Sequence, residues 1–467
     1  MKMLFLNPPT RDNKKFIREG RCMQLTSSWA AIWPPLSLAT LAAIAKGLGH
    51  EVRIVDANVE DVTFEQIPSL SDGVDLVVVN TSFPSIDSDL AAAQVIKTSH
   101  PKTIVVSFGV FFTLVREASL PEDGSIDYAL VGEPDATFRE LLVALSNGSD
   151  PNAVPGLLFR RDGQLVFTGE RALMTDLDEL PLPERTLLHN ERYVLPHNGE
   201  PFTLINTSRG CPFQCTYCIV HAYYGRKIRR HSLDYIFKEI EYCMKHFSLR
   251  NFLLWEEAFT LNPQVVKDFC QGLRERGLNI NWAVTTRADS LEPELLRLMK
   301  DTGCFLVGMG IESSSQDILD RCKKQVTVEA LARGVRYCNE VGLPAMGHFI
   351  FGLPGETPKT AKATIAFAKR LGLTYMQSYC AVPYPRTEFG ELARKEGWVS
   401  TREWSRYDFG GDSIVNMPEM PAELVTSFRK KCFVRFYFRP STILRELKKL
   451  GSWGHLRQAL SFLGWIR

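Results

Sequence analysis

The chain has 467 residues, long enough for roughly two to four packed domains, so a single small binding module is excluded. Apolar residues make up 45% of the chain and charged residues 23%, which is the balance of a globular protein and not of a disordered one. The formal net charge of +2 produces no overall field strong enough to indicate a nucleic-acid or acidic partner.

Eleven cysteines are present, an odd number in a long chain. Together with the lack of a secretory signal, this number argues against a disulfide scaffold and indicates a reducing compartment, where clustered thiols can bind metal. The apolar start at Met1–Leu6 is too short for a signal peptide, and no uninterrupted apolar run reaches the roughly 18 residues of a membrane span. We therefore expect a soluble, cytoplasmic protein.

Residues 1–150 predict a doubly wound, Rossmann-like α/β domain. Five short apolar runs alternate with segments of helical spacing, which is typical of a parallel sheet covered on both faces. The expected strands are Met3–Leu6, Glu51–Val55, Leu76–Val79, Thr103–Val106 and Tyr128–Val131. Open α/β sheets bind ligands at the carboxyl edge of their strands. The polar residues and glycines that follow these strands include Asp56, Asn58, Thr81, Ser82, Gly109, Gly132 and Glu133.

The next two regions predict a linker and a barrel. Residues 151–196 are rich in proline and contain an Asp162-Gly163 turn between two short apolar runs, which predicts a hairpin and a linker. In residues 197–405 the alternation of strands and helices resumes, which predicts a partial or complete (β/α)6 barrel. Its expected strands are Thr203–Thr207, Asn251–Leu254, Ile280–Val284, Phe305–Gly308, Gly347–Phe351 and Tyr375–Tyr379.

Residues 406–467 differ in charge from the rest and predict a helical C-terminal segment. Residues 421–467 carry ten Lys and Arg residues against two Glu, and Phe428–Arg439 interleaves aromatic with basic side chains. Residues 443–450 then show apolar spacing. Such a basic amphipathic helix can rest on an anionic membrane, or it can pack on the open side of the barrel with its charges in water. Gly451 and Gly454 interrupt the apolar face and favour packing on the barrel.

Cys211, Cys215 and Cys218 crowd together directly after the first barrel strand. Their C-x3-C-x2-C spacing leaves a tetrahedral zinc site one ligand short, but it suits a 4Fe-4S cluster in which three thiolates hold three irons. The fourth iron then stays open for a chelating substrate. Three buried structural cysteines or an incomplete zinc site are the alternatives. The remaining cysteines lack partner spacing and are expected to be small buried hydrophobes, namely Cys22, Cys243, Cys270, Cys304, Cys322, Cys338, Cys380 and Cys432.

With this loop the chain resembles the radical S-adenosylmethionine (SAM) enzymes, whose signature loop has this spacing and an aromatic residue before the last cysteine. The resemblance implies that SAM chelates the open iron. An external one-electron reductant, of flavodoxin or ferredoxin type, then drives its cleavage to methionine and a 5′-deoxyadenosyl radical. The resemblance further implies that Tyr217 packs near the adenine, that Glu256 and Glu257 face the SAM amino group, and that Arg287 contacts its carboxylate. Glu312 is implied as a ribose or methionine contact.

Some of these residues have an ordinary structural alternative. Glu256 and Glu257 also suit a solvated loop that leads into a helix, and an isolated arginine such as Arg287 is common on protein surfaces. Glu356 can be part of a helix start with Thr357. Arg386, where relatives often have glycine, either projects toward the barrel mouth, where it can meet an acidic substrate group, or lies on the surface.

A doubly wound front domain joined to such a barrel resembles the cobalamin-binding subclass over nearly the whole chain. The likeness includes Asn7-Pro8-Pro9, the helix start at Pro34-Pro35-Leu36 and the strand end at Asn80-Thr81-Ser82. The loop that supplies a cobalt-binding histidine in other cobalamin domains reads Asp56-Ala57-Asn58 here, so binding is expected without that ligand. A domain that has lost its ligand is one alternative. A nucleotide site is the other, and the two prolines after the first strand disfavour it because they remove backbone donors.

The resemblance therefore implies a cobalamin-dependent radical SAM methyltransferase. It is expected to methylate an unactivated carbon or phosphorus centre of a small-molecule or lipid-like substrate, by way of methylcobalamin and the 5′-deoxyadenosyl radical. An oxidative cyclase resembling the anaerobic magnesium-protoporphyrin monomethyl ester cyclase and a non-catalytic cluster-bearing protein are the alternatives. The acidic pair and Arg287 argue against the latter, since holding a cluster does not need them. The tRNA-modifying methylthiotransferases carry a second cysteine set that is absent here, so no nucleic-acid partner is expected.

Overall fold

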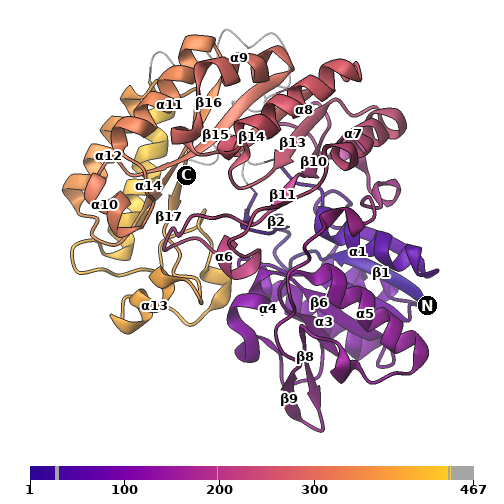
Figure 1. The fold of residues 1–467 in the computed structure, drawn as a ribbon. Helices are drawn as coiled ribbons and strands as arrows, with labels where there is room; N and C mark the ends of the chain where they lie inside the picture. The colour runs from indigo at the N-terminus through magenta and orange to yellow at the C-terminus, as the bar shows by residue number, and fades with distance from the viewer. Residues whose placement is uncertain (27–30, 197, 440–441, 443–467) are drawn as a thin grey trace.

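The computed structural model describes residues 1–26, 31–196, 198–439 and 442, which form a front α/β domain and a β/α barrel (Figure 1). The front sheet has seven strands in the order β4-β1-β5-β6-β7-β8-β9. The pairs from β4 to β7 run parallel, and the last two pairs run antiparallel. The strands are β1 (Lys2–Asn7), β4 (Glu51–Asp56), β5 (Leu76–Asn80), β6 (Ile104–Phe108), β7 (Tyr128–Leu130), β8 (Leu157–Arg161) and β9 (Gln164–Phe167).

Helices cover both faces of the front sheet, which confirms the doubly wound architecture. The central strand β5 reads LVVVN and is buried along its whole length, as a strand covered on both faces must be. Helices α1 and α5 contribute to one apolar cluster and α2, α3 and α4 to another. The hairpin expected near the Asp162-Gly163 turn also forms, and it extends this sheet instead of standing apart from it. The helices are α1 (Leu36–Gly47), α2 (Ile67–Leu70), α3 (Ile86–Ser99), α4 (Val110–Val115) and α5 (Pro134–Asn147).

The second sheet is a partial barrel of six parallel strands in the order β10-β13-β14-β15-β16-β17. Its strands are β10 (Phe202–Asn206), β13 (Asn251–Trp255), β14 (Asn281–Thr286), β15 (Cys304–Glu312), β16 (Ala345–Phe351) and β17 (Tyr375–Cys380). The helices around it are α7 (Leu233–Phe247), α8 (Pro263–Glu275), α9 (Pro293–Asp301), α10 (Gln316–Arg321), α11 (Val328–Val341), α12 (Pro358–Arg370) and α13 (Glu388–Lys395). Side-chain caps start several of them: Ser232 accepts from Tyr235 N, Thr327 from Ala330 N and Thr357 from Thr360 N.

The aromatic and basic stretch at 428–439 packs on the barrel. It belongs to α14 (Ala422–Tyr437), which lies along the outer face of β16 and β17 beside α12 (Figure 1). Phe428, Cys432 and Phe436 are buried there, and the Tyr437 hydroxyl donates to Met376 O at 2.8 Å. The helix thus covers the last strands from outside, and not the open side of the barrel. The apolar spacing at 443–450 and the two glycines beyond it lie outside the described residues.

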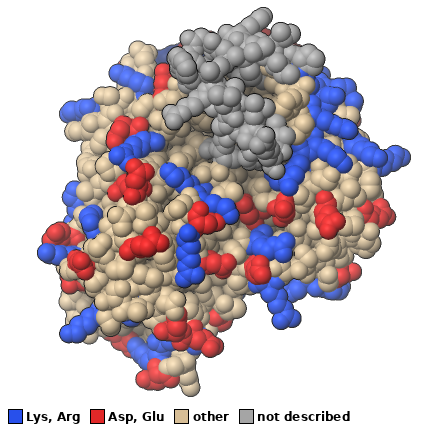
Figure 2. Space-filling model, turned by 180° about the vertical axis from the view of Figure 1, so that it is seen from behind, with Lys and Arg blue, Asp and Glu red and all other residues tan. Residues whose placement is uncertain are grey.

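No helix in the described part of the chain is both long and apolar enough to span a bilayer. Acidic and basic side chains are interspersed over much of the face shown in Figure 2, as expected for a chain whose charges nearly cancel.

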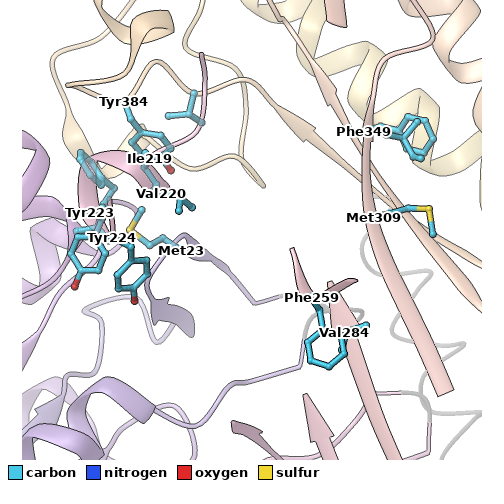
Figure 3. Packing of buried hydrophobic residues seen from close by; sticks show 14 of the residues in the cluster. Met23, Ile219, Val220, Tyr223, Tyr224, Phe259, Val284, Met309, Phe349 and Tyr384 are labelled. Carbon is cyan, nitrogen blue, oxygen red and sulfur yellow. The ribbon is translucent and has the colours of Figure 1, made fainter. Parts of the chain in front are cut away.

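A short antiparallel hairpin of the front domain, which the sequence patterns did not predict, lies between the two domains (Figure 1). It consists of β2 (Phe16–Glu19) and β3 (Cys22–Leu25). Arg18 forms an ion pair with Asp89 of α3 at 2.9 Å, and both side chains are at most 1% exposed. Figure 3 shows Met23 of β3 beside Val220 and Tyr224. Val220 is the first residue of the short helix α6 (Val220–Tyr223) of the barrel domain, and Tyr224 directly follows that helix. The hairpin is therefore held by both domains.

The linker before the barrel is held by one fully buried cation. Arg185 pairs with Glu239 of α7 at 2.5 Å, and the two side chains are 0% and 2% exposed. Its guanidinium also donates to Thr203 Oγ1 at 2.5 Å and to Leu204 O at 2.6 Å. The first barrel strand, the linker and α7 thus meet at a single guanidinium.

Candidate functional site

A cavity of about 450 Å³ occupies the inside of the partial barrel and extends to the β2–β3 hairpin of the front domain. Its lining is mainly apolar and includes Trp33, Leu254 and Trp255. The hairpin contributes Arg21 and Cys22 to the wall. Residues from both domains therefore enclose one chamber.

The three clustered cysteines all line this chamber. Cys211, Cys215 and Cys218 are free and half-buried on the loop that follows β10, whereas seven of the other eight cysteines are fully buried. Gly210 at the start of the loop has φ +95°, and a side chain there would collide with Lys227 O, so the tight turn requires glycine. The expectation of small buried hydrophobes does not hold for Cys22, which is half-buried and lines the same chamber.

The donor set fits a cluster better than a single metal ion. No three metal-binding side chains among the described residues gather closely enough to hold one ion. A cubane cluster, by contrast, holds its thiolates apart on different irons, and three thiols on one cavity-facing loop match that need. Burial raises the pKa of Cys218 to about 12, so this thiol is protonated at neutral pH and must release its proton when it binds iron.

The two adjacent acidic residues after β13 have different surroundings. Glu257 lines the cavity and forms an ion pair with Arg21 of the hairpin. Burial raises the pKa of Glu257, although Arg21 partly opposes the shift. Glu256 is not part of the cavity wall; Arg230 donates to both of its carboxylate oxygens, and Thr207 donates to one of them at 2.8 Å. The structure brings only Glu257 to the cysteine loop.

Tyr217, Arg287 and Glu312, which the resemblance also singled out, line the cavity as well. The Arg287 guanidinium carbon lies 3.7 Å from the centre of the Phe213 ring in the cysteine loop, and this guanidinium donates to both oxygens of Asp289. The Arg287 side chain is therefore held in position by Phe213 on one side and by Asp289 on the other.

Glu312 adopts the left-handed backbone conformation at φ +61° and pairs with Lys324 at 2.8 Å. A side chain at Gly310 would collide with the Glu312 carboxylate, so β15 needs glycine at this place. Lys324 also lines the cavity, and no sequence motif had indicated it. Arg386 is exposed and is not among the lining residues, as its surface alternative predicts.

The front-domain residues expected near cobalamin lie at the carboxyl edge of their sheet, and none of them is among the residues that line the cavity. Asp56 accepts hydrogen bonds from Asn7 Nδ2 at 2.7 Å and from the Tyr193 hydroxyl at 2.8 Å. Burial raises its pKa. Asn58 bonds the backbone of Phe16 in both directions and so anchors the hairpin. These two side chains are engaged by the chain itself.

The other residues expected near cobalamin are also in contact with neighbouring groups of the chain. Thr81 and Gly109 meet closely, since a side chain at Gly109 would collide with Thr81 O. Ser82 Oγ contacts Ser85 Oγ at 2.7 Å, and Gly132 N donates to a threonine hydroxyl at 2.9 Å. Glu133 accepts two hydrogen bonds from Arg229 of the barrel domain. The set therefore includes an interdomain ion pair.

The same edge retains unsatisfied polar atoms. Asn80 Oδ1 and Ser107 Oγ, on the neighbouring strands β5 and β6, are buried without a hydrogen-bond partner in the described part of the chain. Buried polar groups of this kind normally find a partner. A ligand with polar groups seated at this edge can supply it, so the residues present fit an amide-bearing ligand such as cobalamin.

Glu356 lies outside the cavity wall, next to the start of α12. Its Oε2 accepts a hydrogen bond from Gly352 N at 2.5 Å, and burial raises its pKa to about 8, against an ordinary value of 4.5. Since the folded pKa lies above the unfolded one, the folded chain binds the proton more tightly. The resulting stabilisation is complete below about pH 4.5 and is lost as the pH rises through about 8.

The Glu356→Gln variant is therefore expected to lose less thermal stability than the wild type when the pH rises from about 5 to about 8. Glutamine keeps the shape and the Gly352 hydrogen bond but cannot ionise. Melting temperatures of both proteins across this range test the expectation. Parallel curves for the two proteins would contradict it.

Comparison with known proteins defines the class of protein. The radical SAM superfamily model matches residues 205–368, and the B12 binding domain model matches residues 25–142. The chain belongs to the radical SAM enzymes that carry a B12 binding domain.

Particular relatives agree with this class. An uncharacterized methyltransferase of Pyrococcus horikoshii is 30% identical over 449 residues, which cover 96% of this chain and 95% of that protein. The anaerobic magnesium-protoporphyrin IX monomethyl ester cyclase of Rubrivivax gelatinosus is 28% identical over 390 residues, covering 81% of this chain and 69% of that enzyme. Among solved structures, the radical S-adenosylmethionine methyltransferase TsrM from Kitasatospora setae shares the fold with a TM-score of 0.70 at 18% identity, covering 94% of this chain and 89% of that one.

Proposed function

We propose that the protein is a cobalamin-dependent radical SAM methyltransferase that methylates an unactivated carbon or phosphorus centre of a small, mainly apolar substrate. The observation that carries the proposal is the single chamber that joins the cysteine loop, the barrel interior and the front-domain hairpin. Its cofactors are a 4Fe-4S cluster, SAM and cobalamin, in line with both matching domains. The similarity to a methyltransferase over nearly the whole chain supports methyl transfer above cyclisation.

In this proposal Cys211, Cys215 and Cys218 hold the cluster. When bound, the cluster with SAM supplies a carbon-centred radical, and cobalamin supplies the methyl carrier. Glu257 accepts from the SAM ammonium group, and Arg287 donates to the SAM carboxylate. The apolar wall excludes water from the reacting groups.

Three further residues position these groups. Arg21 sets the direction of the Glu257 carboxylate through their ion pair. Lys324 does the same for Glu312, the proposed ribose contact. Tyr217, which lies between the last two cysteines and lines the cavity, is proposed to pack on the adenine.

The Glu257→Gln variant is expected to bind SAM at least about tenfold more weakly, because a hydrogen bond to a charged group contributes roughly 1.5–3 kcal/mol. Glu256→Gln is the matched control: it leaves the affinity for SAM unchanged and lowers stability instead, since Arg230 loses its buried counter-charge. Equilibrium binding of SAM to both reconstituted variants measures the difference. Equal weakening in the two variants would refute the assignment.

We propose the carboxyl edge of the front sheet as the cobalamin site, with Asn80 and Ser107 added to the seven residues named above. No histidine is offered by the loop after β4, so the cobalt is proposed to lack a ligand from there. An external flavodoxin- or ferredoxin-type protein is the proposed reductant. Eleven free thiols suit the proposed cytoplasmic location.

Product analysis tests the proposed function. The protein is reconstituted anaerobically with iron, sulfide and hydroxocobalamin, and is then supplied with SAM and a reductant. Formation of both S-adenosylhomocysteine and 5′-deoxyadenosine supports methyl transfer. Formation of 5′-deoxyadenosine alone supports the cyclase alternative, and formation of neither product overturns both.

A further inference from the structure

The two last barrel strands place a line of polar side chains inside the cavity. Along β16 and β17 buried and half-buried residues alternate, and the half-buried ones face the chamber. His348 on β16 lies opposite Gln377 on β17. Tyr379 follows Gln377 two residues later on β17 and faces the same side. All three line the cavity, and none is explained by the roles proposed above.

The hydrogen bonds among these three residues fix the direction of the protons. The Tyr379 hydroxyl donates its single proton to Gln377 Oε1, which is an acceptor only. Its oxygen lies 3.2 Å from His348 Nδ1 and can only accept there, so the His348 proton is on Nδ1. A neutral imidazole carries one proton, and Nε2 is therefore a bare acceptor.

The second ring nitrogen, His348 Nε2, has no hydrogen-bond partner in the described part of the chain. On the neighbouring strand β15, Gly308 presents no side chain, whereas the space in front of Gly310 is taken by the Glu312 carboxylate and the Lys324 ammonium group. A side chain carbon at Gly308 would lie 3.4 Å from Nε2 and 3.5 Å from Thr285 Oγ1. The absence of a side chain at Gly308 thus leaves Nε2 uncovered on that side.

The charges around the cavity are already paired. Arg21 pairs with Glu257, and Lys324 pairs with Glu312. Of these groups, Glu312 on β15, Arg21 on the hairpin and Lys324 after α10 act on the His348 ring through their charge. Burial is the main cause that lowers the pKa of His348 to about 4, so the ring is neutral at physiological pH. His348 Nε2 is thus a neutral acceptor in a mainly apolar wall whose charged groups are paired.

We propose that His348 Nε2 accepts a hydrogen bond from a neutral N–H or O–H group of a largely apolar substrate bound in the cavity. This inference rests on the proposed function, because it names the substrate class of the same chamber. Gln377 is a positioning residue: it holds the Tyr379 proton and thereby keeps Nε2 bare.

Two probes of equal shape test the proposal on the reconstituted protein with cluster, cobalamin and SAM bound. Indole has an N–H donor and no acceptor of comparable strength, and benzofuran has the same shape without a donor. The wild type is expected to bind indole about fivefold more tightly than benzofuran, the value of one neutral hydrogen bond. Calorimetric titration measures both affinities.

The variants separate the hydrogen bond from mere shape. His348→Leu is expected to lose the preference for indole while it still binds benzofuran. Gln377→Leu is expected to lose the preference for indole as well. Without Gln377 the Tyr379 hydroxyl donates its proton to His348 Nδ1, so the imidazole carries its own proton on Nε2 and Nε2 can no longer accept. Ser378→Ala is the control. Ser378 lies between Gln377 and Tyr379 on β17, but its hydroxyl donates to Arg429 O on the outer face of the strand. Its preference stays as in the wild type.

Nitrogen NMR of ¹⁵N-histidine-labelled protein gives a readout that does not depend on a ligand. The expected signal is a neutral His348 protonated on Nδ1 in the wild type and on Nε2 in Gln377→Leu. A wild type protonated on Nε2, or one that binds the two probes equally or not at all, overturns the proposal. Because these measurements need no turnover, they fail or succeed independently of the product analysis that tests methyl transfer.

Discussion

The Cys218→Ala variant is expected to retain far less iron after anaerobic reconstitution and to cleave SAM no faster than background. All three cysteines of the loop face the chamber, and the proposed cluster leaves one iron open, so no spare thiolate of the loop can replace a lost ligand. Iron and sulfide analysis together with the cluster absorbance measures the first effect. Chromatography of 5′-deoxyadenosine measures the second.

Cys22→Ser supplies the control within the same chamber. Cys22 is also half-buried and lines the cavity, but it belongs to the front-domain hairpin and not to the loop. Iron content in this variant is expected to match the wild type. An unchanged iron content in Cys218→Ala, or an equal loss in Cys22→Ser, would show that the cluster is not held as proposed.

Arg185→Met is expected to destabilise the protein by about 3–5 kcal/mol, the cost of leaving one member of a buried ion pair without its partner. Methionine fills a similar space, but Glu239 then remains buried with no counter-charge. The hydrogen bonds to Thr203 and Leu204 of the first barrel strand are lost as well. Denaturant unfolding followed by circular dichroism measures the change in the free energy of unfolding.

Arg276→Met is the matched control, because Arg276 also pairs with two acidic residues, Asp234 and Glu241, yet at the surface. Exposed pairs contribute at most about 1 kcal/mol, so the unfolding curve is expected to move little. Similar losses of unfolding free energy in Arg185→Met and Arg276→Met would show that burial of the ion pair does not determine its contribution to stability.

The sheets and the cysteine loop were predictable because their signals are local. Strands such as β5, with the sequence LVVVN, are continuous apolar runs that need no partner to be recognised. The loop cysteines share one short segment whose spacing predicts a cluster, and the structure places all three at the cavity. All eleven expected strands of the two main sheets form.

The hairpin β2–β3 was missed because its stability comes from distant residues. Its four-residue strands, FIRE and CMQL, are short and mix polar with apolar side chains. What holds them is the ion pair from Arg18 to Asp89, far along the chain, and the bonds from Asn58 to Phe16. Such contacts leave no periodic trace in the sequence.

The cavity wall shows the same limit at single residues. Glu256 and Glu257 are adjacent in sequence, but Arg230 and Thr207 bind the Glu256 carboxylate outside the cavity. No motif contains Lys324 or Arg21, which enter the wall as the ion-pair partners of Glu312 and Glu257. His348 and Gln377 had a visible signal, since they are polar residues at alternate, inward positions of otherwise apolar strands.

The hairpin also limits how the chain can be rearranged by design. Because Arg21 reaches Glu257 across the domain boundary and Met23 packs beside Tyr224, a chimera that takes its front domain from a relative imports a foreign wall into the reaction chamber. A working exchange must therefore keep residues 16–25 of this chain within the imported domain, together with their partners Asn58 and Asp89.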